Sequence, residues 1–170
     1  MADWHDDPSA GAPPRSGWAR MVVELHVNDL AASRAFWCDV LGFGTAYERR
    51  AEGFVYLEHP EGHQIMLCRR HGRFETGPMQ RPLGRGAMFQ VYLASIRPAL
   101  DALAAQGWPT YFGPREVWRR TGDRESGQRE AFVQDPDGYL VMIAESLGER
   151  ALGAATLVKS RDSEPDLDDA

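Results

Sequence analysis

Glu24 and His26 are the residues of this chain whose types and spacing are best suited to chemistry. They stand two positions apart in the run Met21–Val27, so an extended strand would place both side chains on one face. A carboxylate beside an imidazole can anchor a polar ligand or transfer a proton. The alternatives are an ion pair, within a dimer or at a cavity rim, and a displaced metal site with Gln64 and Gln90. A single histidine with amides is a poor set of metal ligands.

The sequence segments that must position this pair occur twice along the chain. Residues 59–62 read His-Pro-Glu-Gly and precede Met66, and residues 135–138 read Asp-Pro-Asp-Gly and precede Met142 at the same spacing. The strand upstream also recurs, with Val22 in the first copy and Met88 in the second. A duplicated module indicates a two-fold internal architecture with a site between the halves.

Each copy reads as a strand, a helix and three further strands. Asp29 and Ser95 are suitable residues to begin the two helices, and Gly42 and Gly107 stand where the helices should stop. The expected strands are Met21–Val27, Phe43–Arg49, Gly53–Glu58 and His63–Arg69 in the first copy, and Ala87–Leu93, Thr110–Phe112, Arg129–Gln134 and Tyr139–Ala144 in the second. The fold class is therefore α+β.

Alternation along these strands separates an apolar face from a mixed one. The apolar face is typical of a sheet packed under helices. The mixed face carries Val22, Glu24, His26, Gln64, Met66, Cys68, Met88, Gln90, Tyr92, Leu140, Met142 and Ala144. A sealed core would not hold an unpaired Glu24 beside His26. This mixture predicts that the face lines a cavity.

Two further groups are candidates for ligand contact. Tyr47, Phe54 and Trp118 can stack on a flat ligand, although isolated aromatic residues in a sheet more often fill a core. The second copy is longer than the first, which predicts an insertion near Arg119–Arg129. The resulting Arg-rich loop at 115–129 is either a solvated lid or a clamp for an anion.

Composition sets the remaining limits. The net charge is −6, and most of the excess lies in residues 1–19 and 148–170, which we expect to be a disordered N-terminal tail and an acidic C-terminal tail. Between them, 20–147 should form a single domain with modules 20–70 and 85–147. No basic face suggests nucleic acid, and no apolar run is long enough for a membrane span. With two cysteines and no signal-peptide pattern, a cytoplasmic protein is expected.

The first helix and the last turn resemble a known family. Residues 29–43, with Asp29-Leu30, Phe36-Trp37 and Leu41-Gly42-Phe43, and residues 135–139, Asp-Pro-Asp-Gly-Tyr, resemble signatures of the glyoxalase/bleomycin-resistance/dioxygenase superfamily. Its members are also called vicinal oxygen chelate proteins. The resemblance implies two tandem βαβββ modules that curl into a cup-like sheet, commonly as a homodimer.

The resemblance also implies where a metal would be bound. In the family's metal enzymes each module supplies one ligand on its first strand and a glutamate on its last. The matching positions here are Val22, Met66, Met88 and Met142, none of which suits a divalent cation. The sequence therefore predicts no metal and no other cofactor. The chain is similar to the bleomycin-resistance branch, to which residues 127–138 correspond.

These observations predict a metal-free binding protein rather than an enzyme. It would sequester a bleomycin-like antibiotic or another amphipathic small molecule in a cavity at a homodimer interface. The predicted ligand-binding residues are Glu24, His26, Tyr47, Phe54, Met66, Met88, Gln90, Tyr92, Trp118 and Met142. Two alternatives remain: a lyase, isomerase or dioxygenase of the same superfamily with an unconventional site around Glu24 and His26, and a structural dimer without a ligand.

Overall fold

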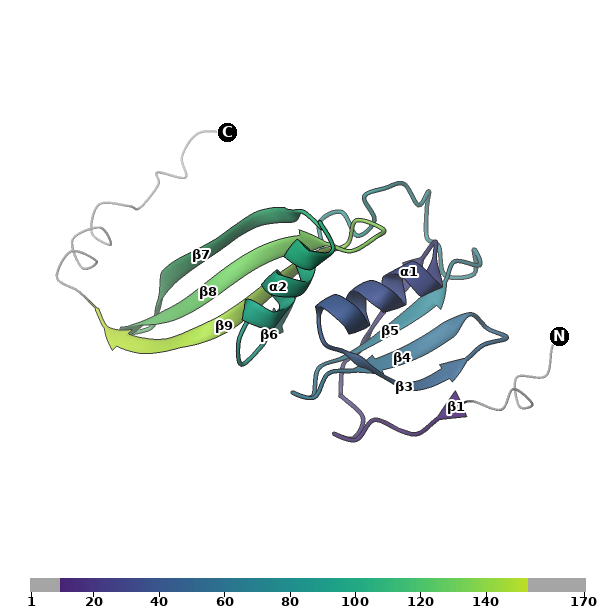
Figure 1. Cartoon of the computed structure of the whole chain (residues 1–170), viewed down its shortest axis with the longest axis horizontal. Helices are drawn as coiled ribbons and strands as arrows, with labels where there is room; N and C mark the ends of the chain where they lie inside the picture. Colours follow the sequence, from purple (N-terminus) through teal and green to yellow (C-terminus); the bar gives the residue numbers. More distant parts are fainter. Residues whose placement is uncertain (1–9, 153–170) are drawn as a thin grey trace, which may run out of the picture.

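The chain folds into two modules of the same βαβββ order (Figure 1). The computed structural model describes residues 10–152. The first module contains β2 (Val23–Val27), α1 (Leu30–Ala35), the π-helical turn η1 (Phe36–Val40), β3 (Gly44–Arg49), β4 (Phe54–Glu58) and β5 (Gln64–Arg69). The second contains β6 (Met88–Tyr92), α2 (Arg97–Ala105), β7 (Thr110–Thr121), β8 (Arg124–Gln134) and β9 (Leu140–Ala151). The α+β fold predicted from the duplication is confirmed.

Both sheets follow the same plan. The order is β1-β3-β4-β5-β2 in the first sheet and β6-β9-β8-β7 in the second, where β1 (Ala10–Gly11) is an added edge strand. In each module the first strand pairs in parallel with the last, and the other module strands pair antiparallel. The parallel pair is possible because the helix of the module carries the chain across the sheet.

The first helix begins and ends at the residues that the sequence indicates. Asp29 is its N-cap, and the carboxylate accepts hydrogen bonds from the backbone N–H groups of Ala31 and Ala32. The helix then widens into η1, and Gly42 follows with φ of +80°. No helix within residues 10–152 is long and apolar enough to span a membrane.

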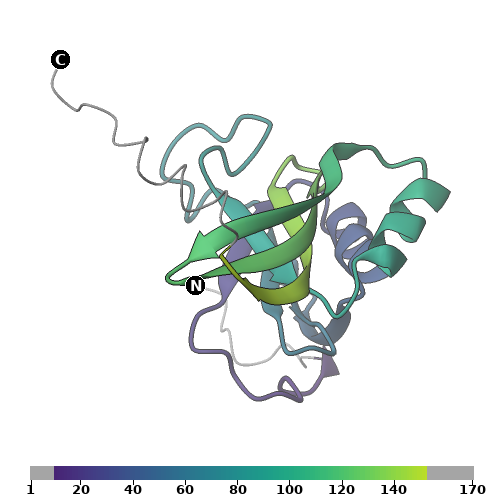
Figure 2. The same cartoon turned by 90° about the vertical axis from the view of Figure 1, so that its left-hand side faces the viewer.

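One apolar core connects the two modules. Figures 1 and 2 show α1 and α2 on the same side of the two sheets, and the inward faces of both sheets and both helices contribute to a single cluster of buried residues. Leu25, Leu67, Val141 and Ile143 belong to it, as the alternation of the strands predicts. The Phe36 ring packs 5.4 Å from the Trp108 ring and so joins η1 to the segment after α2.

The second sheet is longer than the sequence suggests. The prediction of an Arg-rich loop at 115–129 is wrong, because β7 and β8 pair from Arg115 with Glu130 to Thr121 with Arg124. The chain reverses at Gly122, whose φ is +65°, and Asp123. Strand β9 also continues to Ala151, beyond the predicted start of the tail at 148. The extra residues therefore form a three-stranded ribbon that projects beyond α2 (Figure 1).

Residues 10–19 are not disordered as their composition predicts. Strand β1 pairs with β3, and the backbone N–H groups of Arg15 and Ser16 each donate to the Glu58 carboxylate at 2.8 Å. We call residues 10–19 the N-terminal strap. Residues 1–9, and the acidic tail from 153 onwards, lie outside the described residues.

A buried carboxylate joins the two modules. Asp137, in the turn between β8 and β9, accepts hydrogen bonds from the backbone N–H of Asn28 at 2.7 Å and from the Asn28 side chain. Arg81, from the segment between the modules, adds an ion pair at 2.8 Å. Tyr139 reaches back as well, and its hydroxyl donates to the carbonyl of His26 at 3.0 Å. The duplicated turn of the second module thus holds the first strand of the first module.

Candidate functional site

The first sheet presents Glu24 and His26 on the face that points away from the helices. We call this the first cup face. Glu24 pairs across the sheet with Met66, and His26 pairs with Cys68. The imidazole Nε2 of His26 lies 3.1 Å from the Glu24 carboxylate, so the two side chains form a pair of their own. The His71 ring lies 5.3 Å from the His26 ring and Phe74 lies 6.0 Å away, so the segment after β5 borders this pair.

The part of the first cup face formed by β3, β4 and β5 is packed rather than open. Phe54, Tyr56 and Cys68 form a buried cluster with Tyr47 and Met66 beside it. Tyr47 and Tyr56 stack with their ring centroids 5.1 Å apart. The predicted ligand contacts Tyr47 and Phe54 therefore already have apolar neighbours within the chain.

The N-terminal strap covers part of this aromatic cluster. The Trp18 ring contacts Tyr47 and Tyr56 edge-on, and the backbone N–H of Ala19 donates to Gln64. Gln64 also accepts a hydrogen bond from the Tyr56 hydroxyl at 2.5 Å. Gln64 is thus occupied by structural contacts, which leaves the Glu24–His26 pair as the polar part of the first cup face.

The second sheet has an equivalent face, the second cup face, which is much more open. Its strand register defines two adjacent rows of side chains. The first row is Gln90, Met142, Phe132 and Phe112, and the second is Tyr92, Ala144, Glu130 and Arg115. Met88, Tyr92 and Phe112 are about half exposed to solvent. The predicted residues Met88, Gln90, Tyr92 and Met142 are therefore brought together here.

A polar cluster lies at the centre of the second cup face. Glu130 is fully buried, and its carboxylate receives Arg115 at 2.8 Å and Arg119 at 3.0 Å. Gln128 also donates to Glu130, and the Tyr92 hydroxyl donates to Gln128 at 2.6 Å. Burial alone would raise the pKa of Glu130, but the hydrogen bonds from Arg119, Gln128 and Arg115 outweigh it and lower the pKa to about 2.

Substituting Glu130 with glutamine is expected to lower the free energy of unfolding at pH 7 by about 2 kcal/mol. The full pKa difference corresponds to about 3 kcal/mol, reduced because both arginines are half exposed. A lowered pKa stabilises the fold above the unfolded value of 4.5, and this stabilisation is lost as the pH falls toward 2. The free energies of unfolding of the wild type and the variant, measured by urea denaturation, should therefore converge at acidic pH. Glu116→Gln, which removes an exposed carboxylate from the other face of β7, is the control, and equal effects would contradict the prediction.

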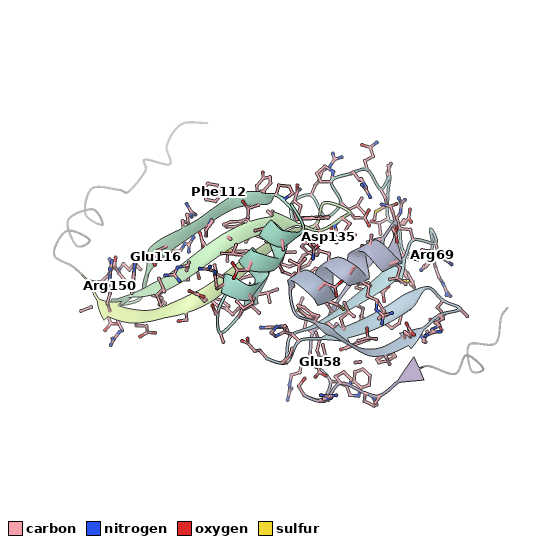
Figure 3. The ribbon with its side chains drawn as sticks, in the orientation of Figure 1. Glu58, Arg69, Phe112, Glu116, Asp135 and Arg150 are labelled. Carbon is pink, nitrogen blue, oxygen red and sulfur yellow. The ribbon has the colours of Figure 1, made fainter. Side chains whose placement is uncertain are left out.

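Trp118 lies on the opposite face of the second sheet from the other predicted ligand contacts. It pairs with Gly127 across the β7–β8 ladder, and a Cβ at Gly127 would come within 2.7 Å of its ring. The guanidinium of Arg150 lies 3.9 Å from the centre of that ring. Figure 3 shows Arg150 at the far end of the projecting ribbon and Phe112 near the base of β7. Trp118 therefore stabilises the ribbon.

The residues at the centre of the second cup face do not form a recognisable site in the sequence. Phe112 and Glu130 lie in two of the expected strands but were not assigned to the cup face. Arg115 was considered only as part of a loop, which has no alternating faces, so it was not placed beside them. The signal was present at Ala131 and Val133, which are buried on the helix side. Counting back along β8 in steps of two from Phe132 places Glu130 and Gln128 on the cup face.

Comparison with known proteins identifies the class to which this fold belongs. The family model for the Glyoxalase/Bleomycin resistance protein/Dioxygenase superfamily matches residues 21–143. The chain belongs to this superfamily. No curated protein matches the chain significantly.

Several solved structures share the fold at low sequence identity. A virulence protein from Salmonella typhimurium is 23% identical with a TM-score of 0.53, over 75% of this chain and 97% of that chain. A bleomycin resistance determinant encoded on the transposon Tn5 is 20% identical with a TM-score of 0.52, over 76% of this chain and 99% of that chain. A glyoxalase/dioxygenase from Nostoc punctiforme is 19% identical with a TM-score of 0.52, over 74% and 88%.

The positions that correspond to metal ligands do not fit a metal ion in this chain. Val22 and Met66 pack against the aromatic cluster of the first cup face, and Met142 is buried between strands of the second sheet. A valine and three thioethers offer no charged or imidazole donor to a hard or borderline cation. Within residues 10–152, no group of three or more His, Cys, Asp or Glu side chains is arranged to hold a metal.

Proposed function

We propose that this protein is a metal-free binding protein that sequesters a small amphipathic molecule on the second cup face. The observation that supports the proposal is the chemistry of that face. An apolar row of Met142, Phe132 and Phe112, in which Phe112 is half exposed, lies directly beside a hydrogen-bonded polar row containing Glu130 and Arg115. Ligand sites combine an apolar surface with a few fixed polar groups in this way.

A second copy of the chain would complete the cavity. The exposed Met88, Tyr92 and Phe112 side chains leave more apolar surface open than an isolated chain favours. A homodimer in which the first cup face of the partner covers this surface would bring the Glu24–His26 pair over the ligand. Sedimentation equilibrium is expected to give twice the mass of the chain, and a monomer at micromolar concentration would contradict this arrangement.

Binding can be measured with two probes of different origin. Metal-free bleomycin tests the antibiotic, and the uncharged fluorophore prodan tests any apolar site through the blue shift of its emission. We expect at least one of them to saturate at one equivalent per chain. A dissociation constant of 1 μM corresponds to a favourable binding free energy of about 8 kcal/mol.

Variants on the two faces of the second sheet localise the site. Phe112→Asp places a charge at the exposed part of the apolar row and is expected to abolish prodan binding. Trp118→Leu lies on the opposite face, so it should leave the affinity unchanged. If neither probe binds, or if both variants bind prodan equally well, the proposed function is wrong.

A further inference from the structure

We propose that the ligand carries an anionic group on an aromatic ring, and that Arg115 and Arg119 bind the anion. This inference rests on the proposed function, because it assumes that the second cup face receives a ligand. It specifies the charge of that ligand, which a sequestration function leaves open. The chemical class is an aromatic carboxylate or sulfonate.

The charges of the central cluster do not balance. Two guanidinium groups contact one carboxylate, and the pKa of Glu130 is low enough to keep this carboxylate ionised, so the cluster carries one net positive charge. Glu130 is 0% exposed, whereas the side chains of Arg115 and Arg119 are 46% and 49% exposed. The buried glutamate therefore positions the two guanidinium groups, and their outer N–H groups remain available to a second anion.

Other carboxylates of the second sheet do not act as that second anion, because they form ion pairs with other arginines. Arg124, near the tip of the ribbon, pairs with Glu149 at 3.1 Å. Arg129, on the helix side, already lies between Glu116 and Glu145. In the described part of the chain, Arg115 and Arg119 have no carboxylate partner other than Glu130.

The apolar row lies beside this cluster at a suitable distance for an aromatic ring. Rows on one face of a strand are about 7 Å apart, which is close to the separation of ring and carboxylate in a bicyclic aromatic acid. The ring centroids of Phe112 and Phe132 are 5.9 Å apart, and the Arg115 guanidinium lies 4.6 Å from the Phe112 ring centre. An aromatic ring over these side chains would place its carboxylate at the two arginines.

The same geometry disfavours a cationic ligand at this position. A positive group would meet the net positive charge of Arg115 and Arg119 before it reached Glu130, which is covered by its partners. In the first cup face, Glu24 is already paired with His26. The arginines thus select for charge, whereas the apolar row accepts many rings.

Three naphthalenes that differ only in charge test the inference. We expect 2-naphthoate to bind at least tenfold more tightly than 2-naphthalenemethanol, and 2-naphthylmethylammonium to bind most weakly, by isothermal titration calorimetry at low salt. Raising the salt concentration should weaken only the binding of naphthoate toward that of the alcohol.

Substitutions identify the arginines as the source of the preference. Arg115→Gln and Arg119→Gln should each reduce naphthoate affinity about tenfold while affinity for the alcohol stays the same. Arg120→Gln, which removes an exposed arginine one residue away on the other face, should change neither. Each single arginine variant leaves the cluster without a net charge and weakens the support of Glu130, so the melting curve of each variant reports whether the fold is retained.

The outcomes separate this inference from the proposed function. If the three naphthalenes bind equally, or the ammonium binds most tightly, the anion site is wrong while the binding function stands. If naphthoate preference persists in both arginine variants, the anion is bound elsewhere and the inference is overturned. Failure of all three naphthalenes together with prodan and bleomycin overturns both.

Discussion

Substitution of Asp137 with alanine is expected to lower the free energy of unfolding by about 4 kcal/mol. The carboxylate is only 1% exposed and receives the backbone N–H of Asn28, the Asn28 side chain and Arg81. Hydrogen bonds to a charged group contribute about 1.5–3 kcal/mol each, and removal of the acceptor leaves a backbone N–H without a partner. Urea denaturation at pH 7 measures the difference.

Two milder variants show which contact matters. Arg81→Gln removes an exposed partner and should cost less than about 1 kcal/mol. Asp137→Asn keeps an oxygen for the Asn28 N–H, so we expect a loss between those of the other two variants. If Asp137→Ala were no more destabilising than Arg81→Gln, the turn would not hold the two modules together as described.

The neighbouring Asp135 is expected to make the protein more stable as the pH falls from about 6 to 4. Burial raises the pKa of Asp135 to about 6, even though the backbone N–H groups of Tyr139 and Asp137 donate to it and favour the charged form. The folded state therefore binds the proton more tightly than the unfolded state, whose pKa is 3.8. Protonation stabilises the fold by about 3 kcal/mol once the pH is below both pKa values.

Comparison with Asp135→Asn isolates this effect from other titrations. The amide keeps an oxygen for the two backbone N–H groups but does not titrate, so its free energy of unfolding should change less between pH 7 and pH 4. The Glu130 carboxylate acts in the opposite direction and at lower pH, because its pKa in the fold is about 2. If the free energy of unfolding changed equally with pH in the wild type and in Asp135→Asn, Asp135 would not be buried as described.

The sequence predicted the module plan because duplication and alternation are properties of the chain itself. Strands β4 and β5 lie within one residue of their expected positions, and the side chains that alternation assigns to the helix side, Val55, Leu57, Ile65 and Leu67, belong to the main core. The ribbon of β7 and β8 was missed because α2 does not cover it, so both of its faces carry charged residues and no apolar alternation appears. Its strands are stabilised by cross-strand pairs such as Arg129 with Glu116.

The candidate site was predictable only where the alternation of a strand shows which residues point away from the helices. Alternation placed Met88, Gln90, Tyr92 and Met142 on one face, and the strand register agrees. It could not be applied to Trp118, which lies on the other face. The strap was missed for a different reason. Its contacts, such as Ser16 with Glu58, join residues far apart in the chain and leave no periodic pattern in the sequence.

The N-terminal strap also changes how the two halves of this duplicated chain can diverge over time. Copies of one ancestral module begin under the same constraints. Once the strap packs on Tyr47 and Tyr56, substitutions at those positions disturb a folded contact, as substitutions in a core do. Met88 and Phe112 have no such cover, so their replacement alters the exposed face at a small cost to folding. New specificities can therefore arise by mutation in the second half while the first half preserves the fold.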